Sequence, residues 1–270
     1  MASPLALVRP LNLLAIAIAA GVGARLGRAP LEWSALLVPV LVGAFGYARN
    51  DAVDLAADRV NRPGRPLPSG ALSPRAANLA ASLALAAAVA LLVVTRRDAL
   101  SLSIASLSAS LLAAYSPWLK ERGPVGPAAI ALLTALAVVW GAATGSAPER
   151  AFLPALLAGA SNFARECVKH LEDAPGDRAA GRKTWVVSSG PAVVTRAARL
   201  GILAALLLLP LPATAGGLGP IYLAAAVPTA GLLFVWALAA LGGSAPHYGR
   251  VSAALKLSSF FGLAALALGA

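Results

Sequence analysis

The chain has 270 residues, of which 59% are hydrophobic and only 12% are charged, and its formal net charge is +11. Soluble globular domains contain about 25% charged residues, so this composition excludes a soluble enzyme, and the high apolar content excludes a disordered chain. The class that remains is a polytopic membrane protein in the lipid bilayer, whose basic loops explain the positive charge without a nucleic-acid partner.

Apolar stretches in chain order predict nine transmembrane helices, because a spanning helix needs roughly 20 mainly apolar residues. The stretch 200–249 has no Asp, Glu, Lys or Arg, but a cluster of Pro and Gly at 210–220 divides it, so it predicts two helices. The nine predicted helices are 5–25, 33–50, 73–94, 99–117, 126–145, 150–173, 195–213, 219–241 and 250–269. We therefore expect an all-α fold, one transmembrane domain over residues 1–270.

The positions of Lys and Arg predict the orientation in the membrane. With a cytoplasmic N-terminus, the outward loops hold only Arg25, Arg28, Arg96, Arg97 and Arg150, which leaves 17 of the 22 basic residues on the inner side. Basic residues favour the cytoplasmic side. We therefore expect a multi-pass integral protein of the cell membrane whose N-terminus and active site are cytoplasmic.

Seven of the eleven Asp and Glu residues fall in two short windows on the same predicted side of the membrane. Each window ends a predicted helix, and each is followed by Arg or Lys. Intramembrane ionisable residues are functional candidates by default. The first window contains Asp51, Asp54 and Asp58, and the second contains Glu166, Glu172, Asp173 and Asp177.

In the first window, Asn50, Asp54 and Asp58 are spaced i, i+4, i+8 and would share one helix face. Such oxygen donors suit Mg²⁺, which takes one or two carboxylates together with water and substrate phosphates. Two facing acidic stripes would repel each other without bound cations or raised pKa values. Magnesium ions that bridge a diphosphate would relieve this repulsion, and the bases that follow would contact its phosphate oxygens.

In the second window, Asp173 and Asp177 repeat the i, i+4 spacing. Pro175 lies between them and disfavours regular helix just before it, so we expect this pair at a helix end or break. Only 151–164 of the predicted helix is free of charge, and its polar end, 165–173, would be unfavourable against lipid. We therefore expect that end to line a water-filled cavity at the centre of the bundle.

These residues resemble a known family. The first window, from Asn50 to Gly70, resembles the NDxxDxxxDxxNxPxRPLPSG signature of the UbiA superfamily of intramembrane prenyltransferases, and the second resembles its DxxxD motif. The segment 9–12 is similar to the family's RPxN element, and 115–120 is similar to its YSxxLK segment. The resemblance covers about residues 8–185, and the nine predicted helices agree with it.

The resemblance implies that Mg²⁺, held by the four aspartates Asp54, Asp58, Asp173 and Asp177 with the help of Asn50, binds an isoprenyl diphosphate. Metal ions and bases would stabilise the leaving diphosphate, and an acceptor would attack C1 of the allylic cation. Tyr115 would shield this cation with its ring face, unless it is an interfacial aromatic. The other implied substrate-binding residues are Arg9, Asn12, Arg65, Lys120, Arg182 and Lys183. The prenyl chain would enter laterally between helices.

Within the superfamily, 165–177 most resembles the archaeal digeranylgeranylglyceryl phosphate synthases, which read RExxKDxEDxxGD followed by a Thr. Thr184 is present, whereas His170 stands where Asp is usual and Pro175 is less common. This implies transfer of a geranylgeranyl group from geranylgeranyl diphosphate to a lipidic acceptor, geranylgeranylglyceryl phosphate, in archaeal ether-lipid synthesis. The alternative is an aromatic acceptor of the 4-hydroxybenzoate type in quinone synthesis, which would use the same core residues.

Two other membrane-protein classes fit less well. A CDP-alcohol phosphotransferase requires a DGxxAR motif, which the chain lacks. A secondary transporter typically has broken helices and charges near the middle of the membrane, whereas these acids lie toward one face.

Overall fold

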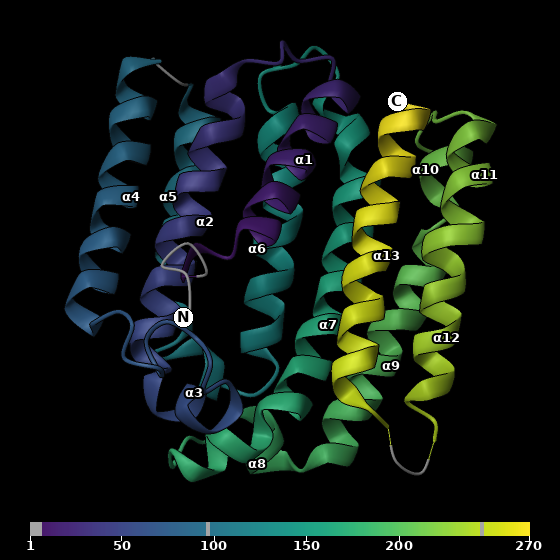
Figure 1. Ribbon diagram of the computed structural model, residues 1–270. Coiled ribbons are helices and arrows are strands. Elements are labelled where there is room, and N and C mark those ends of the chain that lie inside the picture. Colours follow the sequence, from purple (N-terminus) through teal and green to yellow (C-terminus); the bar gives the residue numbers. More distant parts are fainter. Residues whose placement is uncertain (1–6, 96–97, 244–245) are drawn as a thin grey trace.

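The computed structural model describes residues 7–95, 98–243 and 246–270, which form helices joined by loops and contain no strand. The long helices run side by side, and the short helices α3 and α8 lie together at one end (Figure 1). The longer helices are α1 (Pro10–Leu26), α2 (Trp33–Val53), α4 (Pro74–Val94), α5 (Ala99–Tyr115), α6 (Val125–Ala142), α7 (Phe152–Ala179), α9 (Pro191–Leu208), α12 (Leu232–Ala240) and α13 (Tyr248–Gly269). The short helices are α3 (Leu55–Asn61), η2 (Leu119–Glu121), η3 (Pro148–Ala151), α8 (Trp185–Ser189), α10 (Leu211–Thr214), α11 (Pro220–Ala226) and η4 (Val227–Gly231).

Each of the nine predicted helical stretches corresponds to helix in the structure. The predicted division of 200–249 is confirmed, because α9 and α10 end before Gly216 and a new helical rod of α11, η4 and α12 begins at Pro220. Residues 5 and 6 of the first predicted helix lie outside the described residues. The same is true of Arg96 and Arg97, which the orientation argument uses.

Local sequence signals explain where several helices begin. Pro occupies the first position of α1, α4, α9 and α11, where its missing N–H costs no helical hydrogen bond. The Ser73 hydroxyl caps α4 by accepting from the Ala76 N–H at 3.2 Å. The Asp98 carboxylate caps α5 by accepting from the Ser101 N–H at 2.9 Å.

Five of the described helical rods are long and apolar enough to cross a membrane, and α1 and α5 are shorter apolar helices. Large apolar side chains cover the outside of the bundle. On α4, for example, Leu83 and Val93 are exposed. Such a surface suits lipid rather than water. The helices α2 and α7 are not among these five, and both face the interior site described below.

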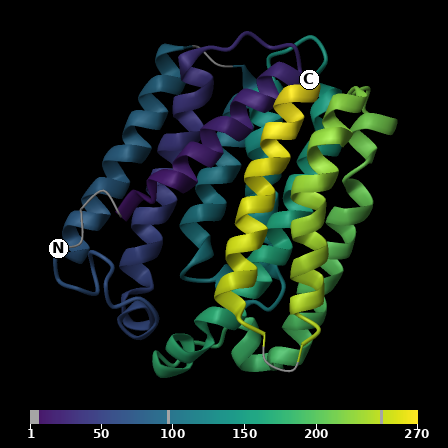
Figure 2. The same ribbon diagram turned by 45° about the vertical axis from the view of Figure 1, so that its right-hand side comes forward.

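Small residues allow α1 and α6 to cross at close range. A Cβ atom at Gly141 would lie 1.8 Å from the Ala20 carbonyl oxygen, and one at Gly23 would lie 2.0 Å from the Val138 carbonyl oxygen. Only glycine fits such a backbone contact, as at many membrane helix crossings. At the other side of the bundle, α13 packs between α7 and α12 (Figure 2).

The structure corrects two local expectations about the acidic windows. The first window is not one continuous helix, because α2 ends at Val53 and Asp54 joins it to α3. In the second window, the expected break is wrong, because α7 continues through Pro175 to Ala179. The pair Asp173 and Asp177 does lie near a helix end, in the last two turns of α7.

Asn61 of α3 holds the backbone of α7 on both sides of Pro175. Its side-chain oxygen accepts from the Gly176 N–H at 2.9 Å, and its side-chain nitrogen donates to the Asp173 carbonyl at 2.8 Å. A proline removes one backbone donor and disturbs the preceding turn. Asn61 supplies partners for the neighbouring backbone groups and thereby fastens α3 to the end of α7.

Candidate functional site

The two acidic windows meet at one end of the bundle, as the sequence predicts. The Lys120 ammonium group lies 2.9 Å from Asp54 Oδ2 and 3.5 Å from Asp177 Oδ1, so it touches one aspartate of each window. Arg62 makes a second link, because its Nη1 atom lies 2.5 Å from Asp173 Oδ1 and 3.8 Å from Asp58 Oδ1. The four aspartates are therefore close enough to act on one diphosphate-sized ligand.

These side chains surround a small polar cavity of about 30 Å³. It adjoins a larger cavity of about 510 Å³ inside the bundle, and Asn50, Arg65 and Tyr115 line both. Apolar residues such as Val38, Ile104 and Phe234 line the larger cavity. The site therefore joins a charged end to an apolar chamber, which matches a ligand with a charged head and a hydrocarbon chain.

Basic side chains hold the carboxylates in place. Arg182 donates to Asp54 Oδ1, to the Ser116 carbonyl at 2.5 Å and to Glu121 at 3.0 Å. Burial lowers the pKa of Lys120, but the charges of Asp54 and Asp177 more than offset this and raise it above its ordinary value. Lys120 therefore stays a cation in a buried position.

Asp58 lies in α3 and is buried, with 4% of its surface exposed. Burial raises the pKa of its carboxyl above the ordinary value, Arg65 opposes this shift from 2.6 Å, and the charges of Asp51 and Asp54 add to it. The raised pKa of Asp58 therefore comes mainly from burial, with a smaller contribution from two carboxylates of its own window. A divalent cation or further donors would favour the charged form.

Asp51 is a site residue to which the sequence reasoning gave no role, although it stands in the first window. It is buried and accepts hydrogen bonds from Arg9 and, at 3.5 Å, from Arg65. Arg9 has a positive φ of 52° immediately before Pro10 and lies over the Tyr47 ring at 5.0 Å. Such a strained backbone persists where surrounding contacts hold it, and here they aim Arg9 into the cavity.

The remaining predicted residues differ in position. Tyr115 is buried between the two cavities, and Asn12 lines the larger one. Lys183 is exposed and lines neither cavity, so the structure does not bring it to the site. The reason is that Thr184, the next residue, points inward and donates to Asp177 Oδ2 at 3.1 Å.

The residues present fit Mg²⁺ by the chemistry of their donors. Among the described residues, no group of three or more Asp, Glu, His or Cys side chains is arranged to hold a metal ion alone. Magnesium does not need one, because one or two carboxylates plus water and phosphate oxygens suffice. The two aspartate pairs offer such carboxylates. Asn50 Oδ1 is buried at the same cavity and has no hydrogen-bond partner among the described residues.

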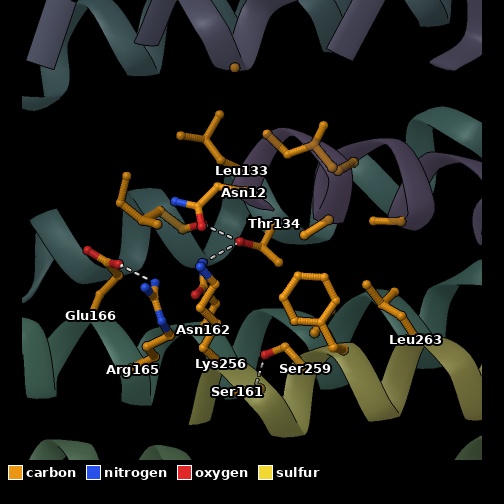
Figure 3. Close-up of a pocket in the computed structure, with 18 of the residues that line it drawn as sticks. Asn12, Leu133, Thr134, Ser161, Asn162, Arg165, Glu166, Lys256, Ser259 and Leu263 are labelled. Atoms are coloured by element: carbon orange, nitrogen blue, oxygen red, sulfur yellow. Dashed lines mark hydrogen bonds and ion pairs between the residues drawn. The ribbon is translucent and has the colours of Figure 1, made fainter. Parts of the chain in front are cut away.

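The polar end of α7 lines the larger cavity, which confirms the expectation that it avoids lipid. Arg165, Glu166 and Lys169 all lie on the cavity wall. Figure 3 shows Arg165 and Glu166 toward one end of the cavity and Leu263 toward the other. Asn162 lies between them and donates to Thr134 Oγ1 at 2.5 Å (Figure 3).

Comparison with known proteins agrees with this architecture. The chain matches the UbiA prenyltransferase family over residues 11–268. It is 37% identical over 268 residues to the digeranylgeranylglyceryl phosphate synthase of Methanopyrus kandleri, with 98% of each chain covered. The chain belongs to the UbiA prenyltransferase family, and its long apolar helices make it an integral membrane protein.

Solved structures share the fold. One, from work on digeranylgeranylglyceryl phosphate synthase in membranes, aligns with a TM-score of 0.74 at 28% identity and covers 97% of this chain and 95% of its own. A UbiA homologue from Archaeoglobus fulgidus, bound to GPP and Mg²⁺, aligns with a TM-score of 0.60 at 20% identity. The alignment covers 97% of this chain and 98% of the homologue.

Proposed function

We propose that the protein transfers a geranylgeranyl group from geranylgeranyl diphosphate to the hydroxyl group of geranylgeranylglyceryl phosphate, with Mg²⁺, in archaeal ether-lipid synthesis. The observation that carries this proposal is the meeting of the two acidic windows, with Lys120 in contact with Asp54 and Asp177. The likeness over nearly the full chain to the Methanopyrus kandleri synthase supports the choice of acceptor.

Two aspartate pairs, with help from Asn50, would hold the metal ions. The first pair is Asp54 and Asp58, and the second is Asp173 and Asp177. Bound Mg²⁺ would supply positive charge to the diphosphate as it departs. Lys120 and the arginines Arg62, Arg65 and Arg182 already face the polar cavity or its aspartates, so their N–H groups can turn to the phosphate oxygens. Arg9 and Asn12 border the start of the larger cavity, which takes the hydrocarbon chains.

In this reaction the C1–O bond of the donor breaks, and the diphosphate keeps its electron pair. The acceptor oxygen forms the new bond to C1, and its proton leaves to water or to the diphosphate product. Tyr115 lies buried between the two cavities, where its ring can face the carbocation at C1. The apolar residues that line the larger cavity disfavour water beside that cation.

We further propose that all nine helical rods cross the cell membrane, with the N-terminus and the aspartates toward the cytoplasm. The basis is the excess of Lys and Arg at that side. A diphosphate donor would then reach the site from the cytoplasm, while its chain enters from the bilayer.

The test is incubation of the purified protein with geranylgeranyl diphosphate, Mg²⁺ and either geranylgeranylglyceryl phosphate or 4-hydroxybenzoate, followed by mass spectrometry. We expect the ether product only, and we expect Asp54→Asn and Asp173→Asn to abolish it. Glu149→Gln, at an exposed position in the loop between α6 and α7, is the control and should stay active. Prenylation of the aromatic acceptor instead would overturn the assignment, and full activity of the Asp variants would overturn the metal site.

A further inference from the structure

Lys256 is a charged residue within an apolar membrane helix. It lies eight residues after the start of α13, which places it about 12 Å along the helix axis. Its side chain lines the larger cavity, and it makes no hydrogen bond or ion pair with any residue that the structure describes. A lone charge at such depth is unfavourable and marks a functional position.

Lys256 is part of a cationic cluster with Arg165 and Lys169 of α7. Lys169 contacts both oxygens of Glu166, at 3.1 and 3.2 Å, and Arg165 contacts the same carboxylate at 3.2 Å. Arg165 Nε is buried without a hydrogen-bond partner among the described residues. The cluster therefore has two unused donor groups, one on Arg165 and one on Lys256.

The charge of this cluster is not balanced locally. Arg165 and Lys169 both contact the carboxylate of Glu166, and Lys256 contacts no carboxylate of the described residues. The three cations therefore have one anion among them, which leaves a surplus of two positive charges. Glu172, the other acidic residue on this cavity wall, lies 3.7 Å from Arg62 instead. The charges of Arg165, Arg9 and Lys169 all reach Lys256, but Arg9 already pairs with Asp51. A surplus of two matches a phosphate monoester, which carries about −1.5 to −2 charges at neutral pH.

The cluster is also distinct from the groups around the aspartates. Lys256 and Arg165 line only the larger cavity, whereas Lys169 and Glu166 line both cavities. Figure 3 shows Lys256 and Arg165 on the same side of the cavity as Glu166. The cluster is thus next to the diphosphate region without being part of it.

We propose that Lys256, Arg165 and Lys169 bind the phosphate monoester of the lipid acceptor, apart from the donor's diphosphate. This inference rests on the proposed function. The acceptor has its phosphate and its free hydroxyl on the same three-carbon unit, so a phosphate held here places the hydroxyl beside the boundary of the two cavities. Tyr115 lies at that boundary. The acceptor's apolar chain then extends into the larger cavity.

The test compares the wild type with Lys256→Met and Lys256→Arg in steady-state prenyl transfer. The acceptors are geranylgeranylglyceryl phosphate and its dephosphorylated form, geranylgeranylglycerol. We expect Lys256→Met to raise KM for the phosphorylated acceptor about 10- to 100-fold, the loss typical of a hydrogen bond to a charged group. The KM for the donor and the turnover of the alcohol should not change, which also shows that the variant is folded. Lys256→Arg should restore most of the affinity.

Arg250→Met is the matched control, because Arg250 is an exposed base on the same helix and lines neither cavity. Arg250→Met should leave KM and turnover unchanged for both acceptors. An equal rise in KM for both acceptors in Lys256→Met, or a raised KM for the donor, would overturn the acceptor-phosphate site. Either result would leave the proposed function intact. A wild type that prenylates neither acceptor would overturn the proposed function and this inference with it.

Discussion

Gly176 lies at the point where α7 meets α3, and its missing side chain allows the two acidic windows to approach. A Cβ atom there would lie 2.4 Å from the Asn61 side-chain nitrogen and 2.5 Å from the Ala57 carbonyl oxygen. Neither neighbour can give way without loss of the Asn61 hydrogen bonds to the backbone of α7. The distance between the aspartate pairs therefore depends on this glycine.

We predict that Gly176→Ala lowers stability by about 1–3 kcal/mol, because the added methyl group overpacks a backbone contact. Turnover should fall about 100-fold, because a shift near 1 Å between catalytic groups costs that much. Thermal unfolding in detergent and prenyl-transfer assays would measure the two effects. Gly64→Ala, which has nothing within 4 Å of its new Cβ atom, is the control. If Gly176→Ala had the stability and turnover of the wild type, α3 and α7 would accommodate the methyl group without disturbing the aspartate pairs.

At the level of residues, spacing in the sequence was enough to find the four aspartates but not their partners. The link from Lys120 to Asp54 and Asp177 joins residues far apart in the chain, and only the folded structure specifies it. Lys256 was missed, although a lone lysine in an apolar helix is a visible signal. Lys183 was grouped with its neighbours by sequence, but the inward turn of Thr184 leaves it exposed.

At the level of elements, the apolar stretches predicted the positions of the helices well, because each lipid-facing helix must satisfy its own backbone. The acidic windows were less predictable. Pro175 argued for a break, yet α7 continues, and Asn61 of another helix supports this turn through hydrogen bonds to the backbone on both sides of the proline. Such compensation depends on tertiary contact, so local preference alone could not reveal it.

The crossing of α1 and α6 provides a second prediction. Because a Cβ atom at Gly141 would lie 1.8 Å from the Ala20 carbonyl oxygen, Gly141→Ala should push the two helices apart. Both helices line the larger cavity, so we expect lower thermal stability, by about 1–3 kcal/mol, and weaker donor binding. The measurements are thermal unfolding and KM for the donor. Ala128→Leu, on the exposed side of α6, should leave both unchanged. If Gly141→Ala matched this control, neither stability nor donor binding would depend on the close contact between α1 and α6.

At the level of the whole molecule, the orientation inferred from Lys and Arg can be tested by labelling. The single native cysteine, Cys167, is fully buried and should not react with a bulky reagent. Ser69 is exposed near the aspartate end of the bundle, and Ser146 is exposed in the loop between α6 and α7 at the opposite end. Cysteines placed at these two positions would therefore report opposite faces of the membrane.

We predict that a membrane-impermeant maleimide labels Ser146→Cys in intact cells and labels Ser69→Cys only after the cells are permeabilised. The physical reason is that basic residues gather at the end with Ser69, and such residues remain on the cytoplasmic side. The unmodified protein, with Cys167 alone, gives the background. The reverse pattern would place the aspartates outside the cell, where a cytoplasmic diphosphate could not reach them, whereas labelling of both in intact cells would mean that Ser69 and Ser146 do not lie on opposite faces.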